Sequence, residues 1–264
     1  MYATNYHRPT SIADAVKLLK ANDEAKLLAG GQTLIPTLKQ RLARPGDLVD
    51  LAGVKDLSYI KVEGGKVTIG ALTRHADVAA SDAVKRAIPA LAHLAGEIGD
   101  PAVRNRGTIG GSLANSDPTA DYPAAVLGLG ATIQTNERTI AGDDYFKGLF
   151  ETALKPGEII TAVSFPVAEK AGYVKFPNPA SRYALVGVFV AKAAGGVRVA
   201  VTGAGPCAFR QKDMEAALGK SWAASALDGI KVSASGLNGD IHASAEYRAH
   251  LIGVMAKRAV AAAG

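Results

Sequence analysis

Two glycine pairs, about eighty residues apart, are the parts of this sequence best suited to bind an anion. They lie in the segments Ala29-Gly30-Gly31-Gln32-Thr33 and Thr108-Ile109-Gly110-Gly111-Ser112. Adjacent glycines accept positive φ and carry no Cβ, so successive backbone N–H groups can converge on a phosphate, as they do at a nest or a helix N-terminus. We therefore expect both segments to be loops, and two such loops could hold two phosphates.

An ordinary tight turn is the alternative for either pair, because a chain with 29 glycines contains such pairs through turn chemistry alone. Two familiar nucleotide-binding patterns are disfavoured. Neither segment continues into the Gly-Lys-Ser/Thr of a Walker loop, and neither is the Gly-x-Gly-x-x-Gly of a dinucleotide-binding βαβ unit. Gly128 and Gly130 come nearest to the second pattern, but the third glycine and the preceding strand are missing.

A polar cluster follows the second pair, from Ser112 to Asp121, and contains hydroxyls, one amide and two carboxylates. Carboxylates repel phosphates but accept hydrogen bonds from the hydroxyls of a ribose or ribityl chain. Asp121 could equally cap a helix that begins at Tyr122, where Pro123 suits the first turn. The local sequence leaves both roles open.

A third candidate region runs from Lys175 to Ala184 and is rich in prolines and large side chains. Tyr183 could stack on a flat ring, and Lys175 could meet a phosphate or an adenine. A buried tyrosine and a solvated lysine are the ordinary alternatives. The segment is therefore either the wall of a ligand cleft or a plain crossing between domains.

Composition excludes several classes of protein. The 264 residues, 48% of them hydrophobic, can bury a substantial core in one large or two modest domains. The net charge of +6 is spread along the chain without basic runs interleaved with aromatics, so we do not expect nucleic-acid binding. The single cysteine, Cys207, excludes an internal disulfide and a cysteine-ligated iron–sulfur cluster within the chain.

Other function classes lack their expected signals. The five histidines, His75 among them, show no metal-ligand spacing, so we expect no metal site and assign them surface or structural positions. No Gly-x-Ser-x-Gly elbow is present, which disfavours hydrolysis. No apolar run is long enough to span a membrane and the first residues lack a hydrophobic signal core, which predicts a cytoplasmic protein without a membrane span.

Hydrophobic periodicity and turn residues divide the chain into short elements. We expect helices over residues 12–21, 34–42, 122–129, 213–218 and 243–262, and a helical region over 76–98 that Pro89 divides. We expect strands over 26–28, 47–51, 159–165, 185–193 and 197–202, and hairpins over 59–69 and 131–140. The pattern changes near residue 170, which predicts domains 1–170 and 171–264, the first with subdomains of about 1–57 and 58–170.

Taken together, these motifs resemble the FAD-binding medium subunit of molybdenum hydroxylases, of the carbon monoxide dehydrogenase and xanthine dehydrogenase type. The resemblance rests on residues 29–36, 41–45 and 103–115, in the same order and spacing, and continues through 117–121, 157–160 and 182–188. It implies an α+β fold. A two-part FAD-binding domain of the vanillyl-alcohol-oxidase (PCMH) type would be followed by a small C-terminal α+β domain with an antiparallel sheet.

The resemblance also implies a set of FAD-binding residues. Both glycine segments would hold the pyrophosphate, Asn115 and Asp121 would meet the ribityl or ribose hydroxyls, and Tyr183 would lie near the isoalloxazine. Ile160 would touch the adenine side and Lys175 would lie near the nucleotide. The residues of the two pyrophosphate loops would be Ala29, Gly30, Gly31, Gln32, Thr33, Thr108, Gly110, Gly111 and Ser112, and Leu34 and Ile109 would be further cofactor-binding residues.

Proteins of this family do not oxidise a substrate by themselves. The resemblance implies partners: a large subunit with a molybdopterin cofactor and a small subunit with iron–sulfur clusters, in a dimer of heterotrimers. This chain would accept electrons from the clusters and pass them to an external acceptor, without a catalytic acid or base, because flavin redox chemistry belongs to the cofactor. Two alternatives stay open: a stand-alone flavin oxidoreductase of the same fold, and a basic module that binds a phosphate ligand.

Overall fold

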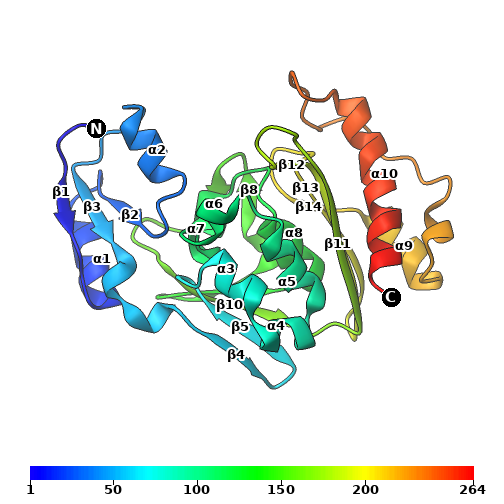
Figure 1. Cartoon of the computed structure of the whole chain (residues 1–264), viewed down its shortest axis with the longest axis horizontal. Helices are drawn as coiled ribbons and strands as arrows, with labels where there is room; N and C mark the ends of the chain where they lie inside the picture. Colours follow the sequence, from blue (N-terminus) through cyan, green and yellow to red (C-terminus); the bar gives the residue numbers. More distant parts are fainter.

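The computed structural model describes all residues from 1 to 264, and three successive sheets organise the chain (Figure 1). We name the parts the N-terminal unit (1–57), the central unit (58–169) and the C-terminal unit (170–264). Figure 1 shows them side by side in chain order, with the central unit between the other two. No helix is both long and apolar enough to cross a membrane.

The N-terminal unit is a small parallel sheet with two helices. Its strands lie in the order β1 (Asn5–His7), β3 (Asp47–Asp50), β2 (Lys26–Leu28), and both pairings are parallel. Helix α1 (Ile12–Ala21) begins where the Ser11 hydroxyl accepts a hydrogen bond from the Asp14 N–H at 3.1 Å. Helix α2 (Leu34–Lys39) follows the first glycine pair, and the 3-10 helices η1 (Leu51–Gly53) and η2 (Lys55–Leu57) end the unit.

The central unit packs helices on a five-stranded antiparallel sheet. The strands lie in the order β4 (Ile60–Glu63), β5 (Lys66–Gly70), β10 (Ile160–Pro166), β6 (Thr132–Thr135), β7 (Thr139–Ala141). The helices are α3 (His75–Ala80), α4 (Asp82–Ala87), α5 (Pro89–Gly96), α6 (Pro101–Arg104), α7 (Ile109–Asn115) and α8 (Tyr122–Leu129). A 3-10 helix, η3 (Gly142–Asp144), and the hairpin β8 (Phe146–Gly148) to β9 (Glu151–Thr152) complete it.

The C-terminal unit is a four-stranded antiparallel sheet between helices. Its strands follow chain order: β11 (Lys170–Pro177), β12 (Ala184–Ala193), β13 (Gly196–Thr202), β14 (Phe209–Arg210). Helices α9 (Lys212–Lys220), η4 (Ala224–Leu227) and α10 (Ala245–Ala262) follow. Helix α10 contacts β11 and β12, while α8 of the central unit contacts β12 and β13 (Figure 1). Because helices cover both faces of the sheet, β12 is buried over eight successive residues and reads as a continuous apolar run.

The α+β class and the antiparallel C-terminal sheet are confirmed, as are the strongly periodic helices and the two hairpins. Other predictions were wrong, and some elements were missed. The helical region 76–98 is three helices, because Ser81 caps a new helix before Pro89 starts another. Helix α6 and the strands β1, β8, β9, β11 and β14 were not predicted. The second glycine pair is not in a loop but in the first turn of α7.

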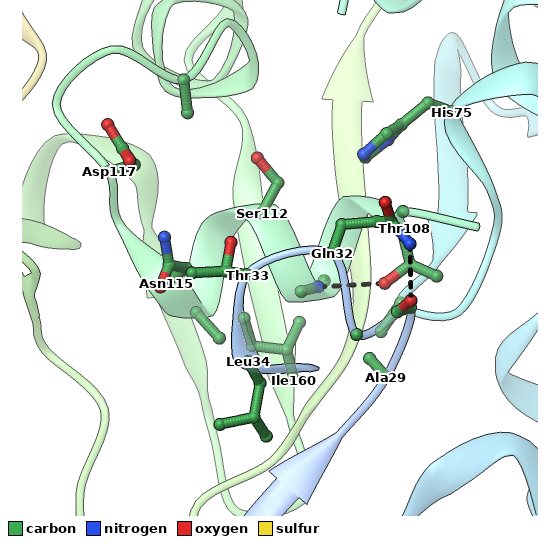
Figure 2. Close-up of a pocket in the computed structure, with 18 of the residues that line it drawn as sticks. Ala29, Gln32, Thr33, Leu34, His75, Thr108, Ser112, Asn115, Asp117 and Ile160 are labelled. Carbon is green, nitrogen blue, oxygen red and sulfur yellow. Dashed lines mark hydrogen bonds between the residues drawn. The ribbon is translucent and has the colours of Figure 1, made fainter. Parts of the chain in front are cut away.

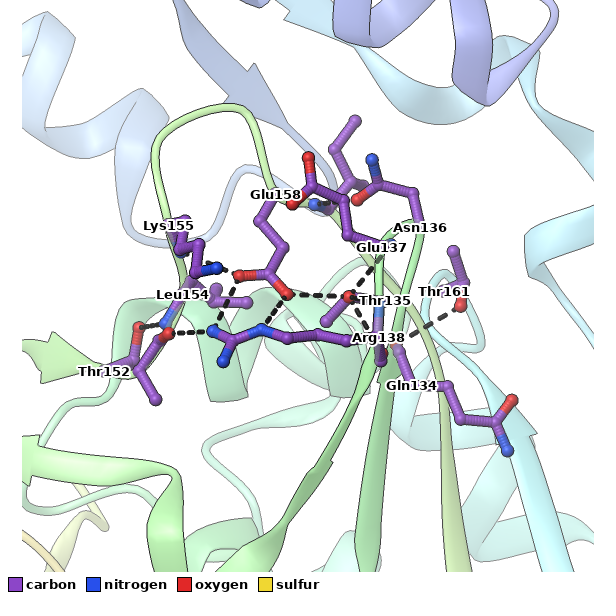
Figure 3. Close-up of polar contacts among 12 residues, drawn as sticks. Gln134, Thr135, Asn136, Glu137, Arg138, Thr152, Leu154, Lys155, Glu158 and Thr161 are labelled. Atoms are coloured by element: carbon purple, nitrogen blue, oxygen red, sulfur yellow. Dashed lines mark hydrogen bonds and ion pairs between the residues drawn. The ribbon is translucent and has the colours of Figure 1, made fainter.

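A buried carboxylate joins the β6–β7 hairpin to the segment that leads into β10 (Figure 3). Glu158, whose side chain is fully buried, accepts hydrogen bonds from Arg138 Nε at 2.9 Å, Thr135 Oγ1 at 2.8 Å and the Lys155 N–H at 2.8 Å. The hydrogen bond from Arg138 is the main reason that the pKa of Glu158 falls to about 2, although burial opposes the shift. This network holds the chain just before Ile159 and Ile160.

The Glu158→Gln variant is expected to lose stability at neutral pH, by on the order of 2 kcal/mol in the free energy of unfolding, because it removes the buried anion that Arg138 faces. The pKa of Glu158 is lower in the folded state (about 2) than the ordinary value of 4.5. The stabilisation is therefore fully present above about pH 4.5 and is lost as the pH falls towards 2.

Urea unfolding at pH 7, 4.5 and 3.5 tests this linkage, and the difference between wild type and variant should shrink as the pH falls. The exposed Glu63, changed to Gln, is the control and should alter the unfolding free energy little at any pH. A difference for Glu158→Gln that stays constant from pH 7 to 3.5 would contradict the assigned role.

Candidate functional site

One large cavity, of about 630 Å³, lies where the three units meet. The N-terminal unit contributes the β2–α2 segment, the central unit contributes α7 with the loop after it, and the C-terminal unit contributes Ser181 and Tyr183. Figure 2 shows the side chains that enter it from the first glycine segment, from α7 and from α3. The volume is typical of a site for a cofactor or another small molecule.

The first glycine segment is a loop, as predicted, and its backbone donors are free. Gly31 has a φ of +72°, and a Cβ on Gly30 would lie 2.2 Å from the Arg106 carbonyl oxygen. The N–H groups of residues 30–33 have no acceptor within the protein, while the Gln32 side chain donates to the Gly30 carbonyl (Figure 2). Successive unpartnered donors beside a cavity are the arrangement that binds an anion.

The second glycine pair differs from its prediction. The Gly110 N–H donates to the Ala71 carbonyl at 2.8 Å, and the Gly111 N–H donates to Thr108 Oγ1 at 3.2 Å, the bond drawn in Figure 2. The expectation of a second loop with free N–H groups is therefore wrong. Gly110 instead permits close packing, since a Cβ there would lie 2.6 Å from the Ala71 Cβ, and Gly111 lines the cavity without a side chain.

Hydroxyl, amide and carboxylate groups gather along one side of the cavity. Figure 2 shows Thr33, Ser112, Asn115 and Asp117 in this region, from the start of α2, from α7 and from the loop that follows. Asp117 accepts hydrogen bonds from the Thr119 N–H and hydroxyl at 2.9 and 2.6 Å, which orient its carboxylate. Such groups suit a ligand that carries several hydroxyls.

Another part of the wall is apolar. Leu34 and Ile160 line it in Figure 2, where they lie close to the end of β2. The remaining apolar residues of this part are Leu27, Leu51, Leu72 and Ile159, which also form the core of the N-terminal unit. A flat heterocycle could be buried here while its polar substituents meet the hydroxyl-rich side.

Asp121 occupies the N-cap position of α8, but its side chain makes no capping hydrogen bond, so the capping alternative is wrong. Its carboxylate instead accepts a hydrogen bond from the Tyr173 hydroxyl at 2.5 Å and pairs with Lys175 Nζ at 3.0 Å. Lys175 also donates to the Glu97 carbonyl at 2.6 Å, and its side chain is only 2% exposed, so the solvated alternative is wrong too. Burial raises the pKa of Asp121, and the Lys175 ammonium and the Tyr173 hydroxyl oppose that rise.

All the predicted binding residues except Ile109 and Lys175 line the cavity. Ile109 is buried in the core of the central unit, and Lys175 lies behind Asp121. Tyr183 is 48% exposed, so it is not the buried tyrosine of the alternative prediction. Residues that lie far apart in the sequence therefore meet in one site, with two of them in supporting positions.

Several lining residues had no predicted role, among them His75, Phe150 and Glu158. His75 is 4% exposed, and burial lowers its pKa to about 4, so the ring is neutral at pH 7. No spacing in the sequence identified it, because its neighbours in space come from other parts of the chain. Phe150 lies in the two-residue turn between β8 and β9 with a φ of +55°, a rare conformation for a bulky residue.

Removing the cation from the buried pair tests the supporting role of Lys175. The Lys175→Met variant is expected to lower the free energy of unfolding by about 3 kcal/mol, because it leaves the Asp121 carboxylate buried and unpaired. Adding Asp121→Asn should recover part of that loss, so the double variant should be more stable than the sum of the single effects predicts. Urea unfolding at pH 7 measures all three variants.

The control is Lys192→Met on β12, whose ion pair with Glu169 is exposed and should contribute less than about 1 kcal/mol. Additive effects of the two changes at Lys175 and Asp121 would show that the residues do not act as a pair.

Comparison with known proteins agrees with this geometry. Residues 2–168 match the family described as the FAD binding domain in molybdopterin dehydrogenase, and residues 173–263 match the CO dehydrogenase flavoprotein C-terminal domain. The chain is 37% identical to the carbon monoxide dehydrogenase medium chain of Afipia carboxidovorans, covering 97% of this chain and 95% of that one. It is 36% identical to the nicotine 6-hydroxylase medium subunit of Paenarthrobacter nicotinovorans, covering 99% and 98%.

Solved structures share the whole two-domain FAD-binding fold. A crystal structure of the Cu,Mo-containing carbon monoxide dehydrogenase superposes with a TM-score of 0.89 at 37% identity, over 98% of this chain and 97% of that one. Quinoline 2-oxidoreductase from Pseudomonas putida 86 also superposes with a TM-score of 0.89, at 29% identity, over 99% and 97%. The chain therefore belongs to the family of FAD-binding medium subunits of molybdenum-containing dehydrogenases and hydroxylases.

Proposed function

We propose that this chain binds FAD in the cavity between its three units and, within a molybdenum hydroxylase complex, carries electrons from iron–sulfur clusters to an external acceptor. The observation that carries the proposal is the row of unpartnered N–H groups over residues 30–33 beside the cavity. A diphosphate needs such donors, and backbone amides supply them without the entropy cost of ordering long side chains.

The rest of the cavity suits the other parts of FAD. The apolar wall around Ile160 would take the adenine, and the Asn115 and Ser112 side would meet the ribityl hydroxyls. Asp121 also lines this side, with one carboxylate oxygen already engaged by Tyr173 and Lys175. Tyr183, half-exposed at the boundary with the C-terminal unit, would lie against the isoalloxazine.

Bound FAD would supply the redox chemistry, and the protein would bind and orient it. The chain cannot hold a cysteine-ligated cluster, because Cys207 is its only cysteine, so any iron–sulfur cluster that supplies its electrons must lie in another protein. Its relatives are named as medium chains or medium subunits, which fits partners that carry the clusters and the molybdopterin cofactor. We place the complex in the cytoplasm as a dimer of heterotrimers.

The Gly111→Val variant tests the cavity assignment. A side chain at this position would grow beside Thr108 and towards Ala29, into the space proposed for the diphosphate. We expect FAD to bind at least tenfold more weakly, a loss of about 1.4 kcal/mol or more, while the far-ultraviolet circular dichroism stays that of the wild type. Titration of the purified chain with FAD, followed by flavin fluorescence, measures the affinity.

Gly253→Val in helix α10 is the matched control, since nothing lies within 4 Å of a Cβ there and the change from glycine to valine alters helix propensity by a similar amount at both sites. Unchanged FAD affinity in Gly111→Val would remove α7 from the binding site. A wild-type chain that binds no FAD but binds nucleic acid in a salt-dependent way would favour the basic phosphate-binding module instead.

Purification from the native host tests the electron-transfer role. We expect flavin to co-purify with chains that carry molybdenum and iron–sulfur clusters, identified by their masses. A lone yellow chain that turns over a small substrate without partners would favour the stand-alone flavin oxidoreductase.

A further inference from the structure

His75 is the lining residue whose position the sequence explains least. It is the first residue of α3, and its N–H donates to the Gly107 carbonyl at 3.0 Å. Figure 2 shows its ring entering the cavity on the side of Thr108 and Gln32. A Cβ on residue 107 would lie 2.6 Å from His75 Nε2, so glycine at that position makes room for the ring.

The same glycine links the ring to the first glycine segment. A Cβ on Gly30 would lie 2.7 Å from the Gly107 Cα, so the loop with unpartnered N–H groups packs directly on the residue that touches His75. The imidazole and the free backbone donors therefore border the same part of the cavity.

The two ring nitrogens of His75 differ in their surroundings. Nδ1 is buried away from solvent and has no hydrogen-bond partner, and the neighbouring ring of Tyr122, 5.4 Å away between centroids, donates nothing to it. An unpaired buried N–H is rarer and less favourable than an unpaired acceptor. The neutral tautomer with its proton on Nε2 is therefore favoured, and that N–H is available to a ligand in the cavity.

The charge state agrees with this arrangement. Burial, with Arg104 nearby, lowers the pKa of His75 to about 4, so the ring is an uncharged donor at pH 7. The ionisable groups that face it are Arg104 from α6 and Tyr122 from α8. No carboxylate among them would accept the Nε2 proton in place of a ligand.

We propose that His75 donates a hydrogen bond from Nε2 to an acceptor oxygen in the diphosphate–ribityl part of bound FAD, an inference that rests on the proposed function. The residue would thus be a cofactor ligand contributed by α3. Its role is to bind and orient the cofactor.

The His75→Phe variant keeps a ring of similar size beside Tyr122 and removes the donor. We expect its dissociation constant for FAD to rise about tenfold, which corresponds to about 1.4 kcal/mol. His75→Gln places an amide donor near the position of Nε2 and should recover most of the affinity. His93→Phe on the exposed face of α5 is the control and should bind FAD as the wild type does.

Nuclear magnetic resonance of the chain labelled with ¹⁵N-histidine provides a readout that packing alone would not move. The His75 Nε2–H signal should shift and exchange more slowly with solvent when FAD is added, while Nδ1 stays unprotonated. This measurement uses the wild-type chain, so it decides the question even where His75→Phe fails to fold.

The outcomes separate the two proposals. If the wild-type chain binds FAD, but His75→Phe binds it equally tightly or the His75 signals do not change, the role of His75 is wrong and the proposed function stands. If the wild-type chain binds no FAD at all, the proposed function itself fails. A tenfold loss in His75→Phe, recovery in His75→Gln and a shifted Nε2–H signal together support the inference.

Discussion

Close contact between backbones at two glycines sets the geometry of the whole site. A Cβ on Gly30 would lie 2.2 Å from the Arg106 carbonyl oxygen, and a Cβ on Gly110 would lie 2.6 Å from the Ala71 Cβ, so both would overlap their neighbours. The contact at Gly30 packs the N-terminal unit against the central unit. The contact at Gly110 packs α7 against the end of β5. The cavity is the space left between these contacts, so its shape depends on the absence of two side chains rather than on the presence of many.

The C-terminal unit contributes little of the cavity wall but holds part of it in place. The Thr202 hydroxyl donates to the carbonyls of Pro118 and Ala120, at 3.1 and 2.6 Å, and the Gly203 N–H donates to Pro118 at 2.7 Å. Together with the Asp121 pair, these bonds tie the loop after α7 to the antiparallel sheet of the C-terminal unit. A loop that is polar and faces a ligand is otherwise prone to move, and buried bonds to a rigid sheet limit that motion.

The groups that line the site and can bind an anionic cofactor are backbone N–H groups and neutral side chains rather than a cluster of cations. The free N–H groups of the first glycine segment carry partial positive charge in fixed positions, and His75 is neutral at pH 7. The one buried lysine close to the site is already paired with Asp121. Under the proposed function, such a site would recognise the shape and the acceptors of a diphosphate and leave the redox properties to the cofactor and its surroundings.

The sequence by itself determined the local features: the caps and periodic helices, the hairpins, the first glycine loop, and the family to which two long motifs belong. These features depend on residues within a few positions of one another. The periodicity of apolar side chains and the hydrogen bonds of capping and turn residues are enough to predict them. Tertiary structure decided the partners that are distant along the chain. The carbonyls of Ala71 and Thr73 accept hydrogen bonds from the N–H groups at the start of α7. Tyr173 donates a hydrogen bond to Asp121, and Lys175 forms an ion pair with it. Gly107 leaves space for the His75 ring. These contacts form only when the separate units pack together, so no local sequence pattern predicts them.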